Sequence, residues 1–157
     1  MTPGDAAAVA EIYSAGIADR IATFETRPRT AADVESWPER YPVVVVEEGS
    51  RVVAWASASA YRPDRSAYAG VRDFSVYVAR DARGTGAGRA ALAGLIDVCR
   101  EAGHWKLLSR IFPENLASLA LCRSMGFREV GTYRRHAQLD GVWKDCVIVE
   151  LLLEEQA

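Results

Sequence analysis

The stretch Val76-Tyr77-Val78-Ala79-Arg80-Asp81-Ala82-Arg83-Gly84-Thr85-Gly86-Ala87-Gly88 runs from a strand pattern into a glycine-rich turn. A helix pattern follows it, with Ala91, Leu92, Leu95, Ile96 and Cys99 spaced to form one apolar face. A glycine turn between a strand and a helix exposes backbone N–H groups that, with the helix dipole, bind phosphate. The stretch therefore predicts a phosphate or pyrophosphate site, and an ordinary structural turn is the alternative interpretation.

Two standard phosphate motifs are excluded. No Lys-Ser/Thr pair follows the glycines, so the turn is not a P-loop. The glycines do not open the first strand–helix–strand unit with an acidic residue about 20 positions further on, so a dinucleotide-binding fold is disfavoured.

The elements around the turn alternate between strand and helix patterns. We expect a helix that begins after Asp5 as N-cap, and a short helix over 30–40 capped by Thr30. Strands are expected over 43–47, 52–60, 71–78 and 106–111, and a helix over 115–125. Strands over 127–139 and 142–153 meet at Asp140-Gly141, a strong hairpin signal. This order predicts a mixed α/β sheet flanked by helices in one domain, residues 1–157.

Composition narrows the function classes. The chain has 157 residues, of which 50% are hydrophobic, and a net charge of −2, so we expect no nucleic-acid partner. No apolar run approaches the roughly 18 residues of a membrane span, and no signal peptide is visible at the N-terminus. The three cysteines lie far apart without metal spacing, which favours a reducing cytoplasm and no metal.

Two motifs in order carry a family resemblance. Arg83-x-x-Gly86-x-Gly88 resembles the acetyl-CoA signature of the GNAT acetyltransferases, and Asn115-x-x-Ser118 with the later pair Gly126-Phe127 resembles a second GNAT segment. The stretches 22–30, 65–68, 73–78 and 141–145 resemble the phosphinothricin N-acetyltransferases, and 19–26 with 136–141 look closest to an arsinothricin-resistance branch. The resemblance implies the splayed GNAT sheet. Because only four residues precede Asp5, the usual first edge strand is expected to be absent or to lie upstream.

The resemblance also implies acetyl-CoA as co-substrate. The backbone of Val76 and Val78 would hold the pantetheine arm, and an N–H near Val76 would polarise the thioester carbonyl. The remaining expected cofactor residues are Tyr77, Arg83, Gly84, Thr85, Gly86, Ala87, Gly88, Arg89 and Asn115.

Two residues are expected to carry the chemistry. Asp73 stands where the phosphinothricin family usually has Glu, so we expect it to act as general base toward the acceptor amine. Alternatively, Asp73 is a strand-end residue paired with a neighbouring Arg. Cys122 stands where relatives often have Tyr or His, and its thiol is either an acid for the leaving CoA or inert packing.

The acceptor site is expected to need cations and apolar walls. The residues predicted to bind the acceptor are Phe24, Thr26, Arg65, Tyr68 and Arg72. Arg72 alternates with Asp73 along the strand, so it enters the site only if a bulge re-aims it. Each Arg is otherwise a solvated surface charge, and each aromatic residue is otherwise a loop anchor.

We therefore expect a cytoplasmic N-acetyltransferase that acetylates phosphinothricin-like amino acids, such as phosphinothricin or arsinothricin, and so confers resistance. A broader enzyme for methionine sulfone, methionine sulfoximine or small amines is one alternative. A non-catalytic acetyl-CoA-binding regulatory module is another. By resemblance alone, the protein is expected to form a homodimer.

Overall fold

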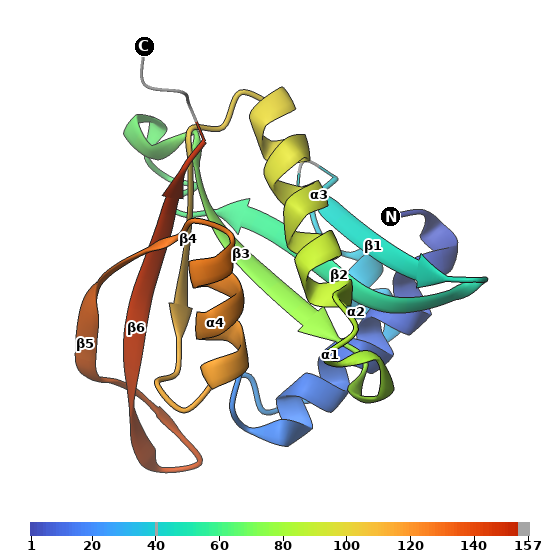
Figure 1. The fold of residues 1–157 in the computed structure, drawn as a ribbon, viewed down its shortest axis with the longest axis horizontal. Coiled ribbons are helices and arrows are strands. Elements are labelled where there is room, and N and C mark those ends of the chain that lie inside the picture. Colours follow the sequence, from blue (N-terminus) through green and yellow to red (C-terminus); the bar gives the residue numbers. More distant parts are fainter. Residues whose placement is uncertain (40, 154–157) are drawn as a thin grey trace.

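The structure, a computed structural model, describes residues 1–39 and 41–153. At its centre lies a six-stranded sheet with the order β1-β2-β3-β4-β6-β5 (Figure 1). The strands are β1 (Val43–Glu48), β2 (Arg51–Ala60), β3 (Val71–Val78), β4 (Lys106–Ile111), β5 (Arg128–Leu139) and β6 (Val142–Leu152). All pairs are antiparallel except β3 with β4, so the expected mixed sheet is confirmed.

Helices cover both faces of the sheet. They are α1 (Ala6–Asp19), α2 (Ala31–Glu35), α3 (Ala87–Glu101) and α4 (Leu116–Ser124). Short 3₁₀ turns occur at Pro3–Asp5, Ser66–Tyr68 and Arg80–Ala82. In Figure 1, α3 and α4 lie over the near face, and α1 and α2 lie behind the sheet. Among the described residues no strand precedes α1, and β1 is the edge strand.

Local details differ from the expectations at three places. Asp5 is the N-cap residue of α1 as expected, but its side chain makes no capping hydrogen bond, because its carboxylate accepts the Thr2 N–H at 2.5 Å. The second helix ends at Glu35, earlier than expected, since Pro38 disfavours helical backbone in the residue before it. The long strand β5 is irregular between Tyr133 and Ala137.

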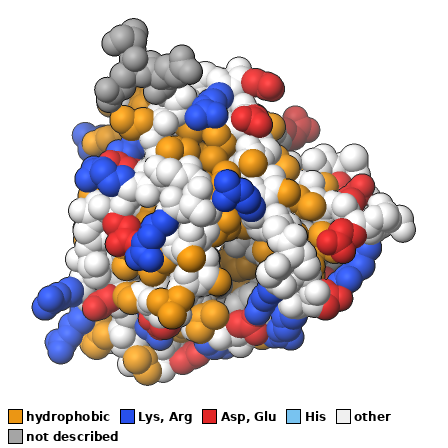
Figure 2. Space-filling model, viewed as in Figure 1, with side chains coloured by type: hydrophobic (Ala, Val, Ile, Leu, Met, Phe, Trp, Pro, Cys, Tyr) orange, Lys and Arg blue, Asp and Glu red, His pale blue; other side chains and the backbone are white. Residues whose placement is uncertain are grey.

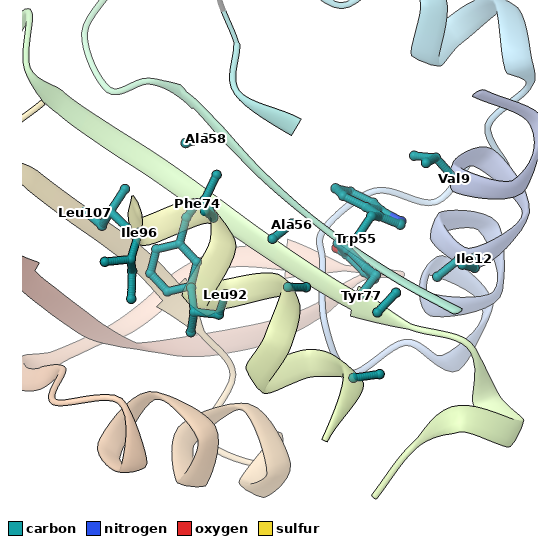
Figure 3. Packing of buried hydrophobic residues seen from close by; sticks show 14 of the residues in the cluster. Val9, Ile12, Trp55, Ala56, Ala58, Phe74, Tyr77, Leu92, Ile96 and Leu107 are labelled. Carbon is teal, nitrogen blue, oxygen red and sulfur yellow. The ribbon is translucent and has the colours of Figure 1, made fainter. Parts of the chain in front are cut away.

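An aromatic core holds the middle of the sheet. Trp55 of β2 stacks on Tyr77 of β3 with ring centroids 4.9 Å apart (Figure 3). Tyr13 of α1 packs on both rings. At Gly16 of α1, an added Cβ would lie 2.6 Å from the Tyr77 ring, so only glycine permits this approach. On the opposite face, Phe74 packs near the apolar side of α3. Strand β3 is therefore packed on both faces.

The sheet splays between β3 and β4. Their parallel pairing covers only three residue pairs, from Val71 opposite Lys106 to Asp73 opposite Leu108. The Ala79 N–H donates to β2, and the Val71 carbonyl accepts the Tyr61 N–H on that same side. Because backbone direction alternates along a strand, the N–H and carbonyl groups of Val76 and Val78 point toward the gap.

Candidate active site

Two adjoining cavities lie where β3 and β4 part. The first, which we call the acceptor cleft, has a volume of about 360 Å³ and contains Asp73, Arg110 and Cys122 in its wall. The second, which we call the turn cavity, has a volume of about 370 Å³ and is bordered by the glycine turn and α4. Val76 and Asn115 line both, so the two cavities are neighbours at the splayed part of the sheet. Figure 2 shows a hollow lined by hydrophobic side chains between α4 and the N-terminal end of α3.

The glycine turn has the backbone that an anion site requires. Gly84 and Gly86 have φ of 78° and 92°, and a Cβ added to either would meet no atom within 4 Å. The Thr85 hydroxyl donates to the Ala82 carbonyl at 2.6 Å and closes the turn. A Cβ on Gly88 would meet Val78 at 3.1 Å, so α3 begins close against β3. The start of α3 faces the turn cavity through Gly88 and Arg89, whereas Ala87, its first residue, is buried and does not line the cavity.

Polar side chains surround this turn. Arg83 donates to Asp19 at 2.7 Å and to the Val78 carbonyl at 3.4 Å. Arg89 donates to Ser124 at 3.0 Å. Asn115 caps α4 by accepting the Ser118 N–H at 3.2 Å. Both arginines border the turn cavity, so their charges lie where a pyrophosphate would need them.

Asp73 lies in the acceptor cleft, at the last position of β3 that pairs with β4. Its side chain is 19% exposed, and its Oδ2 lies 2.9 Å from Nη2 of Arg110 on β4. Burial raises the pKa of the Asp73 carboxyl above its ordinary value, and the Arg110 guanidinium only partly opposes this shift. A carboxylate with a raised pKa is a stronger base than a solvated one. The ion pair with an Arg that the alternative interpretation expects is present. Asp73 also has the burial and the position in the cleft that a general base requires.

Cys122 is 2% exposed and lies in the wall of the acceptor cleft. Burial raises the pKa of its thiol to about 11, so the thiol is protonated at neutral pH. A protonated thiol at this place is compatible with both interpretations, the acid and the packing residue.

The comparisons with known proteins agree with this geometry. Residues 9–127 match the model of the acetyltransferase (GNAT) family. The chain belongs to the GNAT acetyltransferase family. It is 33% identical to the phosphinothricin N-acetyltransferase of Alcaligenes faecalis, over 93% of this chain and 77% of that protein. It is 32% identical to the L-methionine sulfoximine/L-methionine sulfone acetyltransferase of Salmonella typhimurium, over 98% of this chain and 92% of that protein.

A solved GNAT structure has the same fold. The yncA protein of Salmonella typhimurium, solved with its cofactor acetyl-CoA, superposes with a TM-score of 0.93 at 30% identity. The match covers 100% of this chain and 93% of the other. The expected resemblance to GNAT and phosphinothricin enzymes is therefore confirmed, while the arsinothricin branch remains a prediction.

Only one of the five acceptor residues expected from the sequence lines the cleft of this GNAT enzyme. Phe24 does so and packs edge-on against Phe112 at 4.8 Å. Thr26, Arg65 and Tyr68 are exposed, and none of these three lines the cleft. Tyr68 instead packs on Tyr61 with ring centroids 5.6 Å apart.

Arg72 lies on the other face of the sheet from Asp73. The register between β2 and β3 is continuous through this position, so no bulge re-aims the side chain. Arg72 is 8% exposed, and its Nε donates to His104 Nε2 at 3.1 Å. The regular alternation of β3 therefore turns Arg72 away from the cleft.

Sequence reasoning missed the main charged groups of the acceptor cleft. Arg110, Glu25 and His136 were not among the predicted acceptor residues, yet all three line the cleft. The only available signal for Arg110 was a charged residue near the end of a short strand pattern, 106–111. That signal does not indicate a contact with Asp73, because the sequence of neither strand shows how two parallel strands are aligned.

Residues 1–39 and 41–153 contain no group of three or more His, Cys, Asp or Glu side chains arranged to hold a metal ion. Within the same ranges, no helix is both long enough and apolar enough to cross a membrane.

Replacing the Cys122 thiol separates its two possible roles. We expect Cys122→Ser to change kcat by less than about threefold, because a buried thiol with a high pKa serves first as packing. The measurement is steady-state kcat with the melting temperature of the same sample. A fall of about 10²-fold or more without unfolding would show that the thiol acts as a positioned acid.

Proposed function

We propose that this GNAT enzyme transfers the acetyl group of acetyl-CoA to the α-amine of a phosphinothricin-like amino acid. The observation that carries this proposal is the position of Asp73. A half-buried carboxylate of raised pKa lines the acceptor cleft at the residue where the pairing of β3 with β4 ends and the sheet opens.

The residues present fit acetyl-CoA. Gly84 and Gly86 offer positive-φ backbone with open space beside it, and Arg83 and Arg89 border the same cavity. Backbone groups of Val76 and Val78 face the gap and would pair with the pantetheine amides. The amide nitrogen of Asn115 is a further donor on the shared wall. When bound, acetyl-CoA supplies an activated acetyl thioester.

The chain's own chemistry is proton transfer and polarisation. The acceptor amine arrives mostly as an ammonium at neutral pH and cannot attack in that form. Asp73 accepts one proton from it, directly or through one water, and leaves the neutral amine. The Val76 N–H, which points into the gap, would donate to the oxygen where negative charge develops.

The acceptor class follows from the cleft and from the relatives. Phe24 and Phe112 form an apolar wall, and Glu25, Asp73, Arg110 and His136 supply polar groups. The two relatives above act, by their names, on amino-acid analogues with tetrahedral phosphorus or sulfur heads. We therefore propose phosphinothricin or arsinothricin as acceptor, with resistance through detoxification in the cytoplasm as the role. The close relation to the Salmonella enzyme favours methionine sulfone and sulfoximine as the second candidates.

A homodimer is part of the proposal. The β5–β6 hairpin exposes five large apolar side chains between 47% and 59% exposed, which are Val130, Tyr133, Val142, Trp143 and Leu152. Exposed apolar side chains in such number are typical of an interaction surface. Sedimentation of the purified protein measures the state directly, and a monomer at micromolar concentration would contradict this part.

An acceptor panel tests the proposed function. Purified protein with acetyl-CoA is given phosphinothricin, arsinothricin, methionine sulfone, methionine sulfoximine and a simple alkylamine, and free CoA is measured. We expect kcat/KM to be highest for one of the amino-acid analogues and at least about tenfold lower for the alkylamine. If no acceptor releases CoA while acetyl-CoA binds, the protein is a non-catalytic binding module.

A further inference from the structure

The acceptor cleft contains a single cationic side chain of the Lys/Arg type among its described lining residues. That residue is Arg110, whereas Glu25 and Asp73 bring negative charge. Two other arginines near the cleft do not line it and contact other groups. Arg29 pairs with Glu25 and lies over the Tyr13 ring, and Arg72 lies on the opposite face of the sheet. Any anionic group of an acceptor that enters this cleft therefore meets Arg110 first.

Arg110 is only partly used by the contact it makes. Its Nη2 donates to Asp73 Oδ2 at 2.9 Å, and this bond employs one of the five N–H donors of a guanidinium. The Arg110 side chain is 37% exposed, about twice the value for Asp73. Its remaining donors are thus available to a second carboxylate, which a guanidinium binds with two parallel hydrogen bonds.

The pair matches the charge pattern of an α-amino acid. A zwitterion carries an ammonium and a carboxylate on one carbon, so its two charges lie about as close together as the charges of Asp73 and Arg110. An ammonium facing Asp73 would place the adjacent carboxylate beside Arg110. A simple amine, which has no carboxylate, would interact with Asp73 only and would give Arg110 no new partner.

We infer that Arg110 is the specificity residue that binds the α-carboxylate of the acceptor and thereby directs its amine to Asp73. This inference rests on the proposed function and goes beyond it, because it names the group of the acceptor that is recognised. No bond is formed or broken at Arg110. Its contribution is charge and orientation, and the proton moves only from the ammonium to Asp73.

Paired acceptors with and without the carboxylate test the inference. Methionine sulfone is compared with its carboxamide, and phosphinothricin with its carboxamide, in the wild type, Arg110→Gln and Arg110→Lys. For the wild type we expect kcat/KM to be about 10²-fold higher for each acid than for its amide, the size expected for a charged hydrogen-bonded pair. In Arg110→Gln the acids should lose about 10²-fold, mainly through KM, and the amides less than about threefold. Arg110→Lys should restore part of the loss for the acids.

A matched control guards against general effects of removing an Arg–Asp pair. Arg51 forms a two-bond pair with Asp81, at 2.7 and 2.8 Å, on an exposed surface outside both cavities. Arg51→Gln should leave the acid-to-amide ratio unchanged. Melting temperatures of both Gln variants show whether each is folded.

The pH profile supplies a second readout, which reports the contact between Arg110 and Asp73, whereas the acid-to-amide ratio reports recognition of the acceptor carboxylate. Arg110 lowers the pKa of Asp73 against the effect of burial, so Arg110→Gln should shift the acidic limb of kcat/KM to higher pH. The other titratable side chains that line the cleft are Tyr13, Glu25, Tyr77, Cys122 and His136, which the variant leaves in place.

Each contrary outcome has a distinct meaning. Equal losses for acids and amides in Arg110→Gln would overturn the inference while leaving acetyl transfer intact. If phosphinothricin carboxamide, which retains its anionic head, were as sensitive as the free acid while methionine sulfone was not, Arg110 would bind the head group, and the assignment to the α-carboxylate would be wrong. If the wild type acetylated none of the acceptors, the proposed function would fall, and the inference with it.

Discussion

Asp73→Asn is expected to lower kcat/KM by about 10² to 10⁴, the usual contribution of a general base. The change keeps the shape of the side chain and its ability to accept a hydrogen bond from Arg110, but removes the basic oxygen. Acetyl-CoA affinity should hardly change, because the turn cavity lies on the other side of Val76. The loss should shrink as pH rises, since more of the acceptor then arrives as free amine. Initial rates across a pH series measure this directly.

The stability of the same variant distinguishes catalysis from structure. Burial raises the pKa of Asp73 in the folded protein, so folding disfavours its ionised form. That cost appears as pH rises from the unfolded pKa through the raised folded pKa, and it is present in full above both. Removing the charge should therefore leave the melting temperature at neutral pH unchanged or slightly higher. A clear fall in melting temperature with a near-normal rate would instead make Asp73 a structural partner of Arg110.

Two further variants complete this test. Asp73→Glu keeps the carboxylate and should retain most of the activity that Asp73→Asn loses. Glu129→Gln removes an exposed carboxylate paired with Arg123 away from the cleft and should leave the rate unchanged.

Gly86→Val is expected to weaken acetyl-CoA binding at least tenfold, which corresponds to about 1.4 kcal/mol. Gly86 has φ of 92°, a backbone conformation that a β-branched residue adopts only with strain. The added side chain would also project into the open space through which the backbone of the turn approaches the pyrophosphate. Titration calorimetry with acetyl-CoA is the measurement.

The matched control is Gly49→Val. Gly49 has φ of 63° in the turn between β1 and β2, and a Cβ there also meets no atom within 4 Å. Both variants should lose stability through backbone strain, on the order of 1–2 kcal/mol, but only Gly86→Val should lose acetyl-CoA affinity. A folded Gly86→Val protein with unchanged affinity would remove the turn from the cofactor site.

Much of the fold was predictable because its signals are local. The glycine turn, the helix after it and the Asp140-Gly141 hairpin depend on φ preferences and periodicity within a few residues. Features that depend on contacts with residues distant in the sequence were less predictable. The bulge in β5, where Arg135 has φ of 46° and its N–H donates to Asp145 at 2.8 Å, depends on a partner strand.

The sequence by itself determined the order of elements, the glycine turn at the start of α3, and Asp73 as a carboxylate on the strand that precedes this turn. Only the tertiary structure decided which charged side chains share the acceptor cleft. Arg72, adjacent to Asp73 in sequence, is turned to the far face by the alternation of β3. Arg110, 37 residues away, meets Asp73 because β3 and β4 pair in parallel up to that point and then diverge. The register between distant strands arises from packing across the whole sheet, so no local pattern encodes that pair.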